Sequence, residues 1–443
     1  MQKDERFIRG ALTWHDGALR EDWEIRVSAD RISSIGPAES DRTGGAVEDW
    51  GDVAILPGTV NAHGHAFQNL LKGFGDDRPF DSWRDDVLYP FSEHLDEEAV
   101  YVGALFAFAE ALAAGVTTTV DFFYLHDEGN TNAEVVIKAA KDIGIRLVLA
   151  RTFYDVDAPT GAPRRYREPA IDARDRLMAL ARRHAGDPLL SIQPAPHSLH
   201  AARPETIGMA LDAARTLDVP CHLHLAEASY ERAQVEQRYG LSPVRLLDAE
   251  GLLDRRLIAI HTVWVDDQEL DLLAESGCAV VHCPGANAFL GDGMARVPEM
   301  LERGIRVALG PDGGCANNRQ SVFDEMRMAS LVAKARLKDG AALDARTALG
   351  MGTSAGADLL AVDAGRLSPG AFADLVALDL ADLSLQPRAT LERQIVHSMQ
   401  ATAIERVMVG GEVVFAGGRH TRVDASELRA RIDAVTRRWP VTR

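Results

Sequence analysis

The chain has 443 residues, long enough for one large α/β domain and a smaller one. Its 48 Lys and Arg against 66 Asp and Glu give a formal net charge of −18, which disfavours nucleic acid and anionic membrane and leaves a small molecule as the expected partner. The four cysteines form no C-x-x-C pair and are expected to be free thiols. The segment "MQKDERFIRG" lacks the apolar core of a signal peptide, and no apolar run approaches the roughly 18 residues of a membrane span. These features predict a cytoplasmic protein.

Both ends of the chain have the pattern of small antiparallel strands. Near the N-terminus, segments such as "EIRVSADRISSIG" alternate between apolar and polar residues and are separated by turn residues. The pattern returns in "AGRLSPGAFADLVALDL" and "IERVMVGGEVVFAGGRH". We therefore predict a β-sandwich domain formed by residues 1–55 together with 360–443, and a separate central domain over residues 56–359.

The central part holds eight short apolar runs, which begin at positions 54, 117, 145, 190, 220, 257, 278 and 306. Helical stretches such as 97–115, ending at Gly115, separate most of them, which is typical of parallel strands buried on both faces. The pattern predicts an α/β fold, a (β/α)8 TIM barrel, with catalytic groups at the C-terminal ends of the strands. The Pro- and Arg-rich segment 155–169 is expected to be a long loop over the barrel mouth.

Histidines and one aspartate fall at the ends of these predicted strands. His63 and His65 end the first strand, His261 ends the sixth and Asp312 ends the eighth, while His222 and His224 lie in the fifth. Any one of them alone is more often a packed polar residue than a ligand. Residues two apart on a strand face the same way, so each pair can converge on one object, and His222 competes with His224. Three imidazoles and a carboxylate at one rim predict a divalent metal site with a position left for water.

These motifs carry a resemblance. In this order "HGH", "HLAE", "IHTVW" and "GPDGG" resemble the amidohydrolase superfamily, specifically its mononuclear-metal branch of deaminases and chlorohydrolases. "LPG", "AGVTTTVDF", the "NN" at 317–318 and "GRLSPGAFADLVALD" extend the likeness over nearly the whole chain.

The resemblance implies one divalent metal, with zinc first and iron or manganese also acceptable. It also implies a homodimer as one option for assembly. The fourth strand, "SIQPAPH", has no lysine that could bridge a second metal. The residues that the family pattern implies as metal ligands are His63, His65, His224 and Asp312, where the H-x-x-E spacing selects His224 over His222.

Glu227, His261 and Asp312 are implied as catalytic residues of a hydrolase acting on carbon–nitrogen bonds other than peptide bonds. A bound metal lowers the pKa of its water toward about 7, so that hydroxide can add to the C=N carbon of a small amidine-type substrate and ammonia can leave. By resemblance, Asp312 accepts the water proton, His261 steadies the developing charge and Glu227 passes a proton to the leaving amine.

The substrate is left open between two classes. The segments "HAFQN", "SWRDDVLYP", "FFYLHD", "APHSLH" and "ANAFLGDG" resemble formimidoylglutamate deiminases, which act on an acyclic amidine of an amino acid. That likeness implies six substrate-binding residues: Gln68, Trp83, Arg84, Tyr124, His197 and His200. The chain departs from that family at His200, where the family has a carboxylate-binding arginine, and at Gly313, where it has serine. Arg84 could bind a carboxylate instead, or pair with Asp81 or Asp85.

Other segments favour a ring substrate. "LLKGFGDDRPFDSW" and "GPDGGCANN" resemble deaminases of adenosine-like nucleosides, S-adenosylhomocysteine, guanine and triazines. Amide hydrolysis, or displacement of chloride or an alkylamine from a triazine-like ring, is the alternative reaction on the same scaffold. A barrel that had lost catalysis and become a structural module would be expected to lack ligands, and this chain has the full set.

Overall fold

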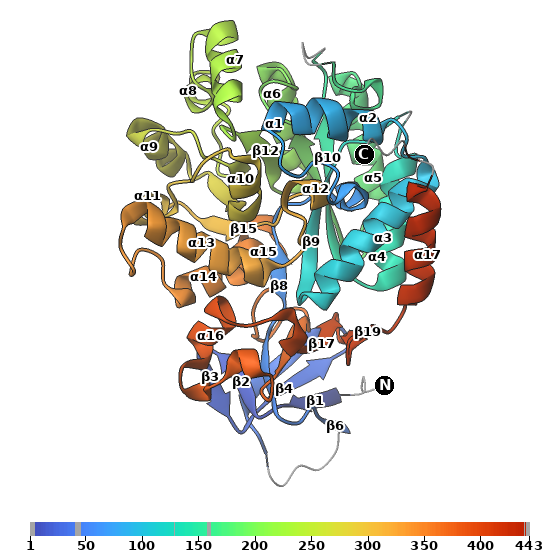
Figure 1. Ribbon diagram of the computed structural model, residues 1–443, viewed down its shortest axis with the longest axis vertical. Coiled ribbons are helices and arrows are strands. Elements are labelled where there is room, and N and C mark those ends of the chain that lie inside the picture. The colour runs from blue at the N-terminus through green and yellow to red at the C-terminus, as the bar shows by residue number, and fades with distance from the viewer. Residues whose placement is uncertain (1–4, 40–45, 128, 157–160, 438, 440–443) are drawn as a thin grey trace.

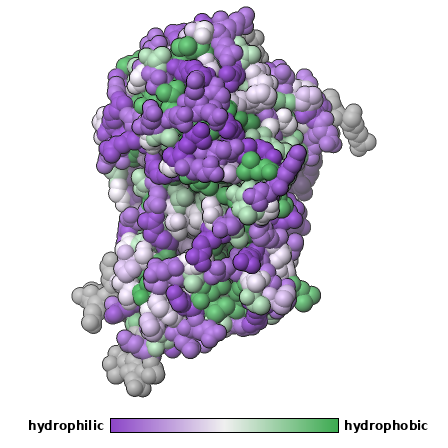
Figure 2. Space-filling view, turned by 90° about the vertical axis from the view of Figure 1, so that its left-hand side faces the viewer, coloured by the Kyte–Doolittle hydropathy of each residue, from purple (hydrophilic) through white to green (hydrophobic). Residues whose placement is uncertain are grey.

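A computed structural model describes residues 5–39, 46–127, 129–156, 161–437 and 439 (Figure 1). The fold is α/β, as predicted: a barrel of parallel strands is enclosed by helices and stands on a smaller β-sandwich. The sandwich combines strands from the N-terminal and C-terminal segments of the chain. The face shown in Figure 2 presents mainly hydrophilic side chains, with hydrophobic ones in small groups between them. In the described part of the chain, no helix is long and apolar enough to cross a membrane.

The barrel strands form two runs of four parallel strands, with the orders β8-β9-β10-β11 and β12-β13-β14-β15. A bridge between Ser198 and His224 joins the runs on one side. On the other side the Ala62 N–H donates to the Leu309 carbonyl oxygen at 3.0 Å. The described residues thus contain the eight predicted strands: β8 (Thr59–Asn61), β9 (Val116–Phe123), β10 (Arg146–Phe153), β11 (Leu190–Pro196), β12 (Cys221–Leu225), β13 (Leu257–His261), β14 (Ala279–His282) and β15 (Val307–Leu309).

Helices connect successive strands and cover the outside of the barrel (Figure 1). Helix α3 (Glu97–Ala113) begins after Asp96, whose carboxylate accepts the N–H of Ala99, and the chain leaves it through Gly115 at φ +82°, as predicted for that glycine. The other main helices are α4 (Thr131–Ile143), α5 (Ala170–Arg183), α6 (Pro204–Leu217), α7 (Ser229–Tyr239), α8 (Pro243–Ala249), α9 (Asp267–Ser276), α10 (Pro284–Leu290), α11 (Val297–Glu302), α12 (Gly314–Asn317), α13 (Val322–Leu337), α14 (Ala345–Met351) and α15 (Ser354–Leu360).

The sandwich consists of two sheets. One has the order β5-β4-β1-β6, and its strands all come from the N-terminal segment: β1 (Glu5–Arg9), β4 (Trp23–Ser28), β5 (Arg31–Pro37) and β6 (Ala46–Asp49). The other mixes the two ends of the chain in the order β19-β18-β17-β16-β7-β2-β3. Its strands are β2 (Leu12–His15), β3 (Ala18–Glu21), β7 (Val53–Pro57), β16 (Leu375–Asp379), β17 (Ile404–Val409), β18 (Glu412–Ala416) and β19 (Arg419–His420).

The first predicted barrel strand, residues 54–65, requires correction, because the structure divides it in two. β7 belongs to the sandwich, where it pairs with β16, and only β8 belongs to the barrel. The chain crosses between the sheets at Gly58, where a Cβ would lie 2.1 Å from Thr117 Oγ1, so that only glycine fits. His63 and His65 consequently follow the strand instead of lying in it.

The domain boundaries at 55/56 and 359/360 stay predictions. The last helix belongs by sequence to the predicted sandwich segment but packs on the barrel. Helix α17 (Ala425–Thr436) lies beside α3 on the flank of the barrel (Figure 1). Its Arg431 pairs with Glu98 at 2.7 Å and its guanidinium lies 4.6 Å from the centre of the Tyr101 ring. The C-terminal segment therefore returns to the barrel after completing the sandwich.

A buried ion pair joins the barrel to the sandwich. Arg146, at the start of β10, donates through Nε and Nη2 to the two oxygens of Asp374 at 2.9 and 3.0 Å, and both side chains are almost fully buried. The guanidinium also lies 3.5 Å from the centre of the Phe372 ring, and Asp374 accepts the N–H of Gly410. The closing "GAFADLVALD" segment thus has a structural function, which is to hold the two parts together.

We expect Asp374→Asn to lower the free energy of unfolding by about 3 kcal/mol, because it leaves a buried guanidinium without its counter-charge. The matched control is Asp363→Asn, which removes the exposed partner of Arg31 and should cost less than about 1 kcal/mol. Urea unfolding of both variants measures the difference. Equal losses would show that the buried pair does not anchor the barrel to the sandwich.

Candidate metal centre and active site

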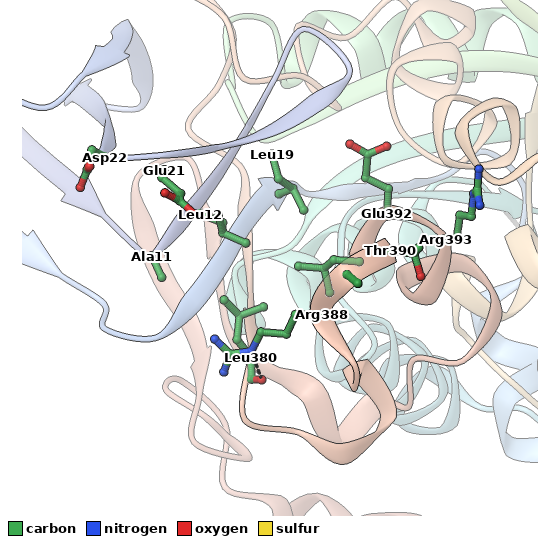
Figure 3. A pocket seen from close by; sticks show the side chains of 12 residues that line it. Ala11, Leu12, Leu19, Glu21, Asp22, Leu380, Arg388, Thr390, Glu392 and Arg393 are labelled. Carbon is green, nitrogen blue, oxygen red and sulfur yellow. Dashed lines mark hydrogen bonds between the residues drawn. The ribbon is translucent and has the colours of Figure 1, made fainter.

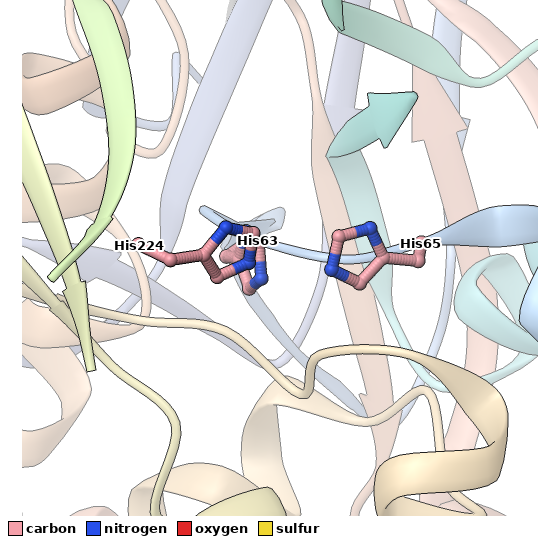
Figure 4. Close-up of side chains that lie close together, drawn as sticks. All are labelled: His63, His65 and His224. Atoms are coloured by element: carbon pink, nitrogen blue, oxygen red, sulfur yellow. The ribbon is translucent and has the colours of Figure 1, made fainter. Parts of the chain in front are cut away.

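Three imidazoles converge at the C-terminal end of the barrel. His63 and His65 come from the segment after β8 and His224 from β12, and Figure 4 shows their rings pointing toward one another from opposite sides. One nitrogen from each lies within 4.8 Å of the other two. Asp312, after β15, brings Oδ1 to 3.3 Å from His63 Nε2 and 3.4 Å from His65 Nε2. The four side chains could therefore share one divalent metal ion.

Hydrogen bonds behind the rings orient two of these imidazoles. His65 Nδ1 lies 2.7 Å from the Phe122 carbonyl oxygen, and His224 Nδ1 lies 2.8 Å from that of His197. A carbonyl oxygen only accepts, so Nδ1 carries the proton in both rings and Nε2 presents a lone pair to the centre of the cluster.

His63 is fully buried, and neither of its ring nitrogens has a hydrogen-bond partner among the described residues. Burial and the nearby His224 and His222 hold the pKa of His63 well below its usual range, so the ring is neutral. An unpartnered buried imidazole is costly, and a metal ion would satisfy it. The donor set, three neutral imidazoles and a carboxylate, fits such an ion.

His222 does not join the cluster. Its Nε2 lies 2.7 Å from Gln193 Oε1 within the barrel, so it is the packed histidine of the pair, as the H-x-x-E spacing implied. Because it lies on the same strand as His224, it provides a natural control for tests of metal binding.

The strand ends that form this site have unusual backbone conformations. Ala226, His261 and Asp312 have φ values of +52°, +70° and +67°. Residues with a Cβ rarely adopt this left-handed region, and such strain is found preferentially at functional sites.

Glu227 and His261 lie beside the cluster. His261 Nε2 is 3.4 Å from Glu227 Oε1 and 3.9 Å from Asp312 Oδ2. Burial, together with the charges of Asp292 and Asp312, raises the pKa of Glu227 well above its usual range. A raised pKa favours the protonated form of this carboxyl group, which is the form that can donate a proton.

A pocket opens directly over the cluster, and all six predicted substrate-binding residues line it: Gln68, Trp83, Arg84, Tyr124, His197 and His200. Whether they bind substrate stays a prediction. Gln68 is held in place, since its Nε2 donates to the Tyr124 hydroxyl at 2.7 Å and its Oε1 accepts from the Cys315 thiol at 3.3 Å. A Cβ on Gly313 would lie 1.8 Å from that Oε1, so Gln68 as placed requires glycine where formimidoylglutamate deiminases have serine.

Arg84 pairs with both of the acids considered for it. Nε and Nη2 donate to the two oxygens of Asp85 at 2.7 and 3.0 Å, and Nη2 lies 3.2 Å from Asp81. Its guanidinium also lies 5.4 Å from the centre of the Tyr230 ring. The positive charge of Arg84 is thus compensated within the protein.

His197 and His200 share one hydroxyl group. Ser198 Oγ lies 3.0 Å from Nδ1 of His197 and 2.9 Å from Nδ1 of His200. Burial, with smaller contributions from His224 and Arg84, lowers the pKa of His200 to about 3. His200 is therefore neutral near neutral pH and cannot replace a charged arginine.

Sequence reasoning missed much of the pocket wall. Tyr154 directly follows β10, and Tyr230 follows Glu227 by three residues. Tyr166 lies in the expected mouth loop, of which positions 157–160 are outside the described residues. These places in the sequence could have identified the three tyrosines as pocket residues. The remaining lining residues fall within segments quoted for the resemblance, but no pattern singled them out: Phe80, Leu88, Tyr89 and Leu290.

A second, more open cavity of about 740 Å³ lies in the sandwich, between the β2–β3 hairpin and the segment before and within α16 (Leu391–His397) (Figure 3). Its wall combines leucines such as Leu12 and Leu19 with charged residues such as Glu21 and Arg388. The histidine and carboxylate cluster lies at the opposite end of the barrel from this cavity, so we place the active site in the barrel pocket.

Comparison with known proteins identifies the family of the chain. The model of the amidohydrolase family matches residues 54–414. The chain is 34% identical over 440 residues to a 5-methylthioadenosine/S-adenosylhomocysteine deaminase of Nitratidesulfovibrio vulgaris, covering 98% of this chain and 97% of the relative. A relative of the same name from Desulfovibrio desulfuricans is 36% identical, with 86% and 84% covered.

Solved structures share the fold. An adenosine deaminase from Xanthomonas campestris with bound zinc superimposes with a TM-score of 0.89 at 29% identity, over 98% of both chains. The zinc complex of an atrazine chlorohydrolase from Arthrobacter aurescens has a TM-score of 0.90 at 24% identity over 97% of this chain and 99% of the other, a likeness of fold alone. The chain belongs to the amidohydrolase family and is a hydrolase of carbon–nitrogen bonds.

Proposed function

We propose that the chain is a metal-dependent hydrolytic deaminase of an amino-substituted heterocycle, of the kind found in adenosine-type nucleosides. One observation carries this proposal: the Glu227 carboxyl group, whose pKa is raised by burial and by neighbouring carboxyl groups, lies beside His261 in the wall of an aromatic-lined pocket, next to a cluster of three imidazoles and Asp312. A cyclic amidine needs such an acid, because its ring nitrogen must gain a proton as water adds to the neighbouring carbon.

We assign the metal site to His63, His65, His224 and Asp312, with zinc as the expected ion and iron or manganese as acceptable ones. When bound there, the ion supplies a Lewis acid that lowers the pKa of water and orients it. His261 is excluded from this ligand set, because its Nδ1 faces an amide donor, Asn287 Nδ2, at 3.1 Å and its Nε2 therefore carries the proton.

The residues of the chain then have distinct tasks. Asp312 accepts a proton from the attacking water, and Glu227 donates its own proton to the ring nitrogen. Glu227, now a carboxylate, takes the proton of the newly added hydroxyl group and passes it to the exocyclic amine, so that the carbon–nitrogen bond breaks, a carbonyl forms and ammonia leaves. The proton held by Asp312 then returns to Glu227 and restores both groups. His261 donates its Nε2–H toward the oxygen that adds to the carbon. Trp83, Tyr124 and the other rings of the wall provide flat apolar surfaces for a heterocycle.

The charges in the pocket favour a ring over a formimidoyl amino acid. Recognition of a carboxylate is strongest with an uncompensated guanidinium in a bidentate arrangement. Here Arg84 already pairs with Asp85 and Asp81, and His200 is neutral. The full-length relatives with 34% and 36% identity, which are named as deaminases of an adenosine-type nucleoside, support the same class.

The substrate class is tested by ammonia release from the zinc-loaded protein. We expect turnover with amino-substituted purines and their nucleosides, and with some pterins or triazines, because the pocket wall is aromatic and its cations are compensated. Formimidoyl amino acids should give at most a small fraction of that rate. Turnover of formimidoyl amino acids alone would contradict the ring assignment.

The metal ligands are tested by a pair of substitutions on one strand. His224→Ala should reduce bound zinc, measured by inductively coupled plasma mass spectrometry after gel filtration, whereas His222→Ala should leave it near one ion per chain. The difference is expected because only His224 presents a free lone pair to the cluster. Comparable zinc in both variants would show that the ligand assignment is wrong.

The proton donor is tested by Glu227→Gln, which removes the transferable proton but keeps the shape of the side chain. We expect kcat to fall at least about 100-fold while zinc content stays unchanged. Glu236→Gln, at an exposed position of helix α7, which begins two residues after Glu227, is the matched control and should keep wild-type turnover. If Glu227→Gln turned over as fast as wild type, another group would have to supply the proton.

A further inference from the structure

The imidazoles of His65, His224 and His261 differ in the kind of atom that Nδ1 meets. In His65 and His224 that atom is a carbonyl oxygen, an acceptor. In His261 it is the side-chain amide of Asn287, at 3.1 Å, and Asn287 is almost fully buried on helix α10 after the seventh barrel strand. Nδ1 thus faces a hydrogen-bond acceptor in two of these rings and a hydrogen-bond donor in the third.

The surroundings of Asn287 determine which end of its amide faces the ring. The atom near His261 Nδ1 is also 3.4 Å from Asp292 Oδ2, a carboxylate oxygen at the far end of the same turn. An NH2 group has two protons and can donate to both neighbours, whereas a carbonyl oxygen there would face an oxygen of Asp292 and could pair with it only if that carboxyl group carried a proton. The opposite end, Asn287 Oδ1, has no partner among the described residues, and a buried orphan acceptor is less costly than a buried orphan donor.

This orientation fixes the proton of His261. Because Nδ1 accepts from Asn287, the neutral ring carries its proton on Nε2. Nε2 points at two carboxyl groups, 3.4 Å from Glu227 Oε1 and 3.9 Å from Asp312 Oδ2, and makes no hydrogen bond within the described structure. The N–H is therefore free to donate to a group that enters the space between the two acids.

We infer that Asn287 is a positioning residue, which holds His261 as an Nε2–H donor and so keeps it out of the metal ligand set. The nitrogens of His63 and His261 and an oxygen of Asp312 lie within 4.8 Å of one another. If His261 Nε2 carried no proton, these three groups could therefore form a competing ligand set. Asn287 thus decides which three imidazoles bind the metal and which one donates a hydrogen bond. The catalytic consequence rests on the proposed deaminase function, but the tautomer itself does not.

The test is 15N NMR of the zinc-loaded protein labelled at histidine, with the His261 signals identified by their loss in His261→Gln. In wild type we expect a pyridine-type Nδ1 and a protonated Nε2. Asn287→Asp replaces the donor with an acceptor of the same shape and should move the proton to Nδ1. Asn130→Asp, the same charge change in a side chain that accepts from Arg151, is the control and should leave the His261 signals in place.

Two results would overturn the inference: a protonated Nδ1 in wild type, or an Nδ1 signal that does not change in Asn287→Asp. If Asn287→Asp does not fold, Asn287→Leu removes the donor without adding charge, and the Nδ1 signal should then shift from its wild-type position toward the average of the two tautomers, because nothing holds the proton on Nε2. With a ring substrate, Asn287→Asp should lower kcat about 100-fold and change KM less than about threefold. If no substrate of the panel released ammonia, the deaminase proposal would be contradicted, whereas the tautomer assignment from NMR would be unaffected.

Discussion

The structure depends on one costly arrangement: imidazoles and carboxyl groups buried together at the C-terminal end of the barrel. His63, His65, His224 and Asp312 are nearly removed from solvent, and His63 has no hydrogen-bond partner among the described residues. Burial of polar groups without partners costs free energy that a fold does not tolerate without compensation. A divalent cation provides that compensation, so the metal would stabilise the rim of the barrel as well as serve the reaction.

Around this centre, the contacts at the Nδ1 atoms of the imidazoles set which ring nitrogen carries the proton. Carbonyl oxygens of Phe122 and His197 turn two imidazoles into lone-pair donors, and Asn287 turns His261 into a proton donor. The assignment of ligands and catalytic groups is thus a matter of tautomers, which the neighbouring strands and helix α10 set.

Much of this could be predicted from the sequence, because barrel strands leave strong signals. Parallel strands are buried on both faces and appear as apolar runs, and the barrel brings their C-terminal ends to one rim. His63, Glu227 and Asp312 could therefore be placed together from their positions alone. The sandwich followed equally from the strand patterns at the two ends of the chain.

What could not be predicted depends on contacts between distant segments. The division of the first strand at Gly58 is one case, because Gly58 packs so closely on Thr117 that a side chain would not fit. The tyrosines of the pocket wall come from several elements, including the short helix α2 (Tyr89–Ser92) and the first turn of α7, which meet only in the folded chain. Asn287 lies in the quoted segment "ANAFLGDG", but its contact with His261 arises only where α10 meets β13.

The most direct test of the central claim is a crystal structure of the zinc-loaded protein with anomalous data collected on both sides of the zinc edge. We expect one zinc ion, bound by His63, His65, His224 and Asp312 at about 2.0–2.2 Å, with His261 Nε2 outside bonding distance. A zinc ion bound by His261, or an anomalous peak away from this cluster, would contradict the account.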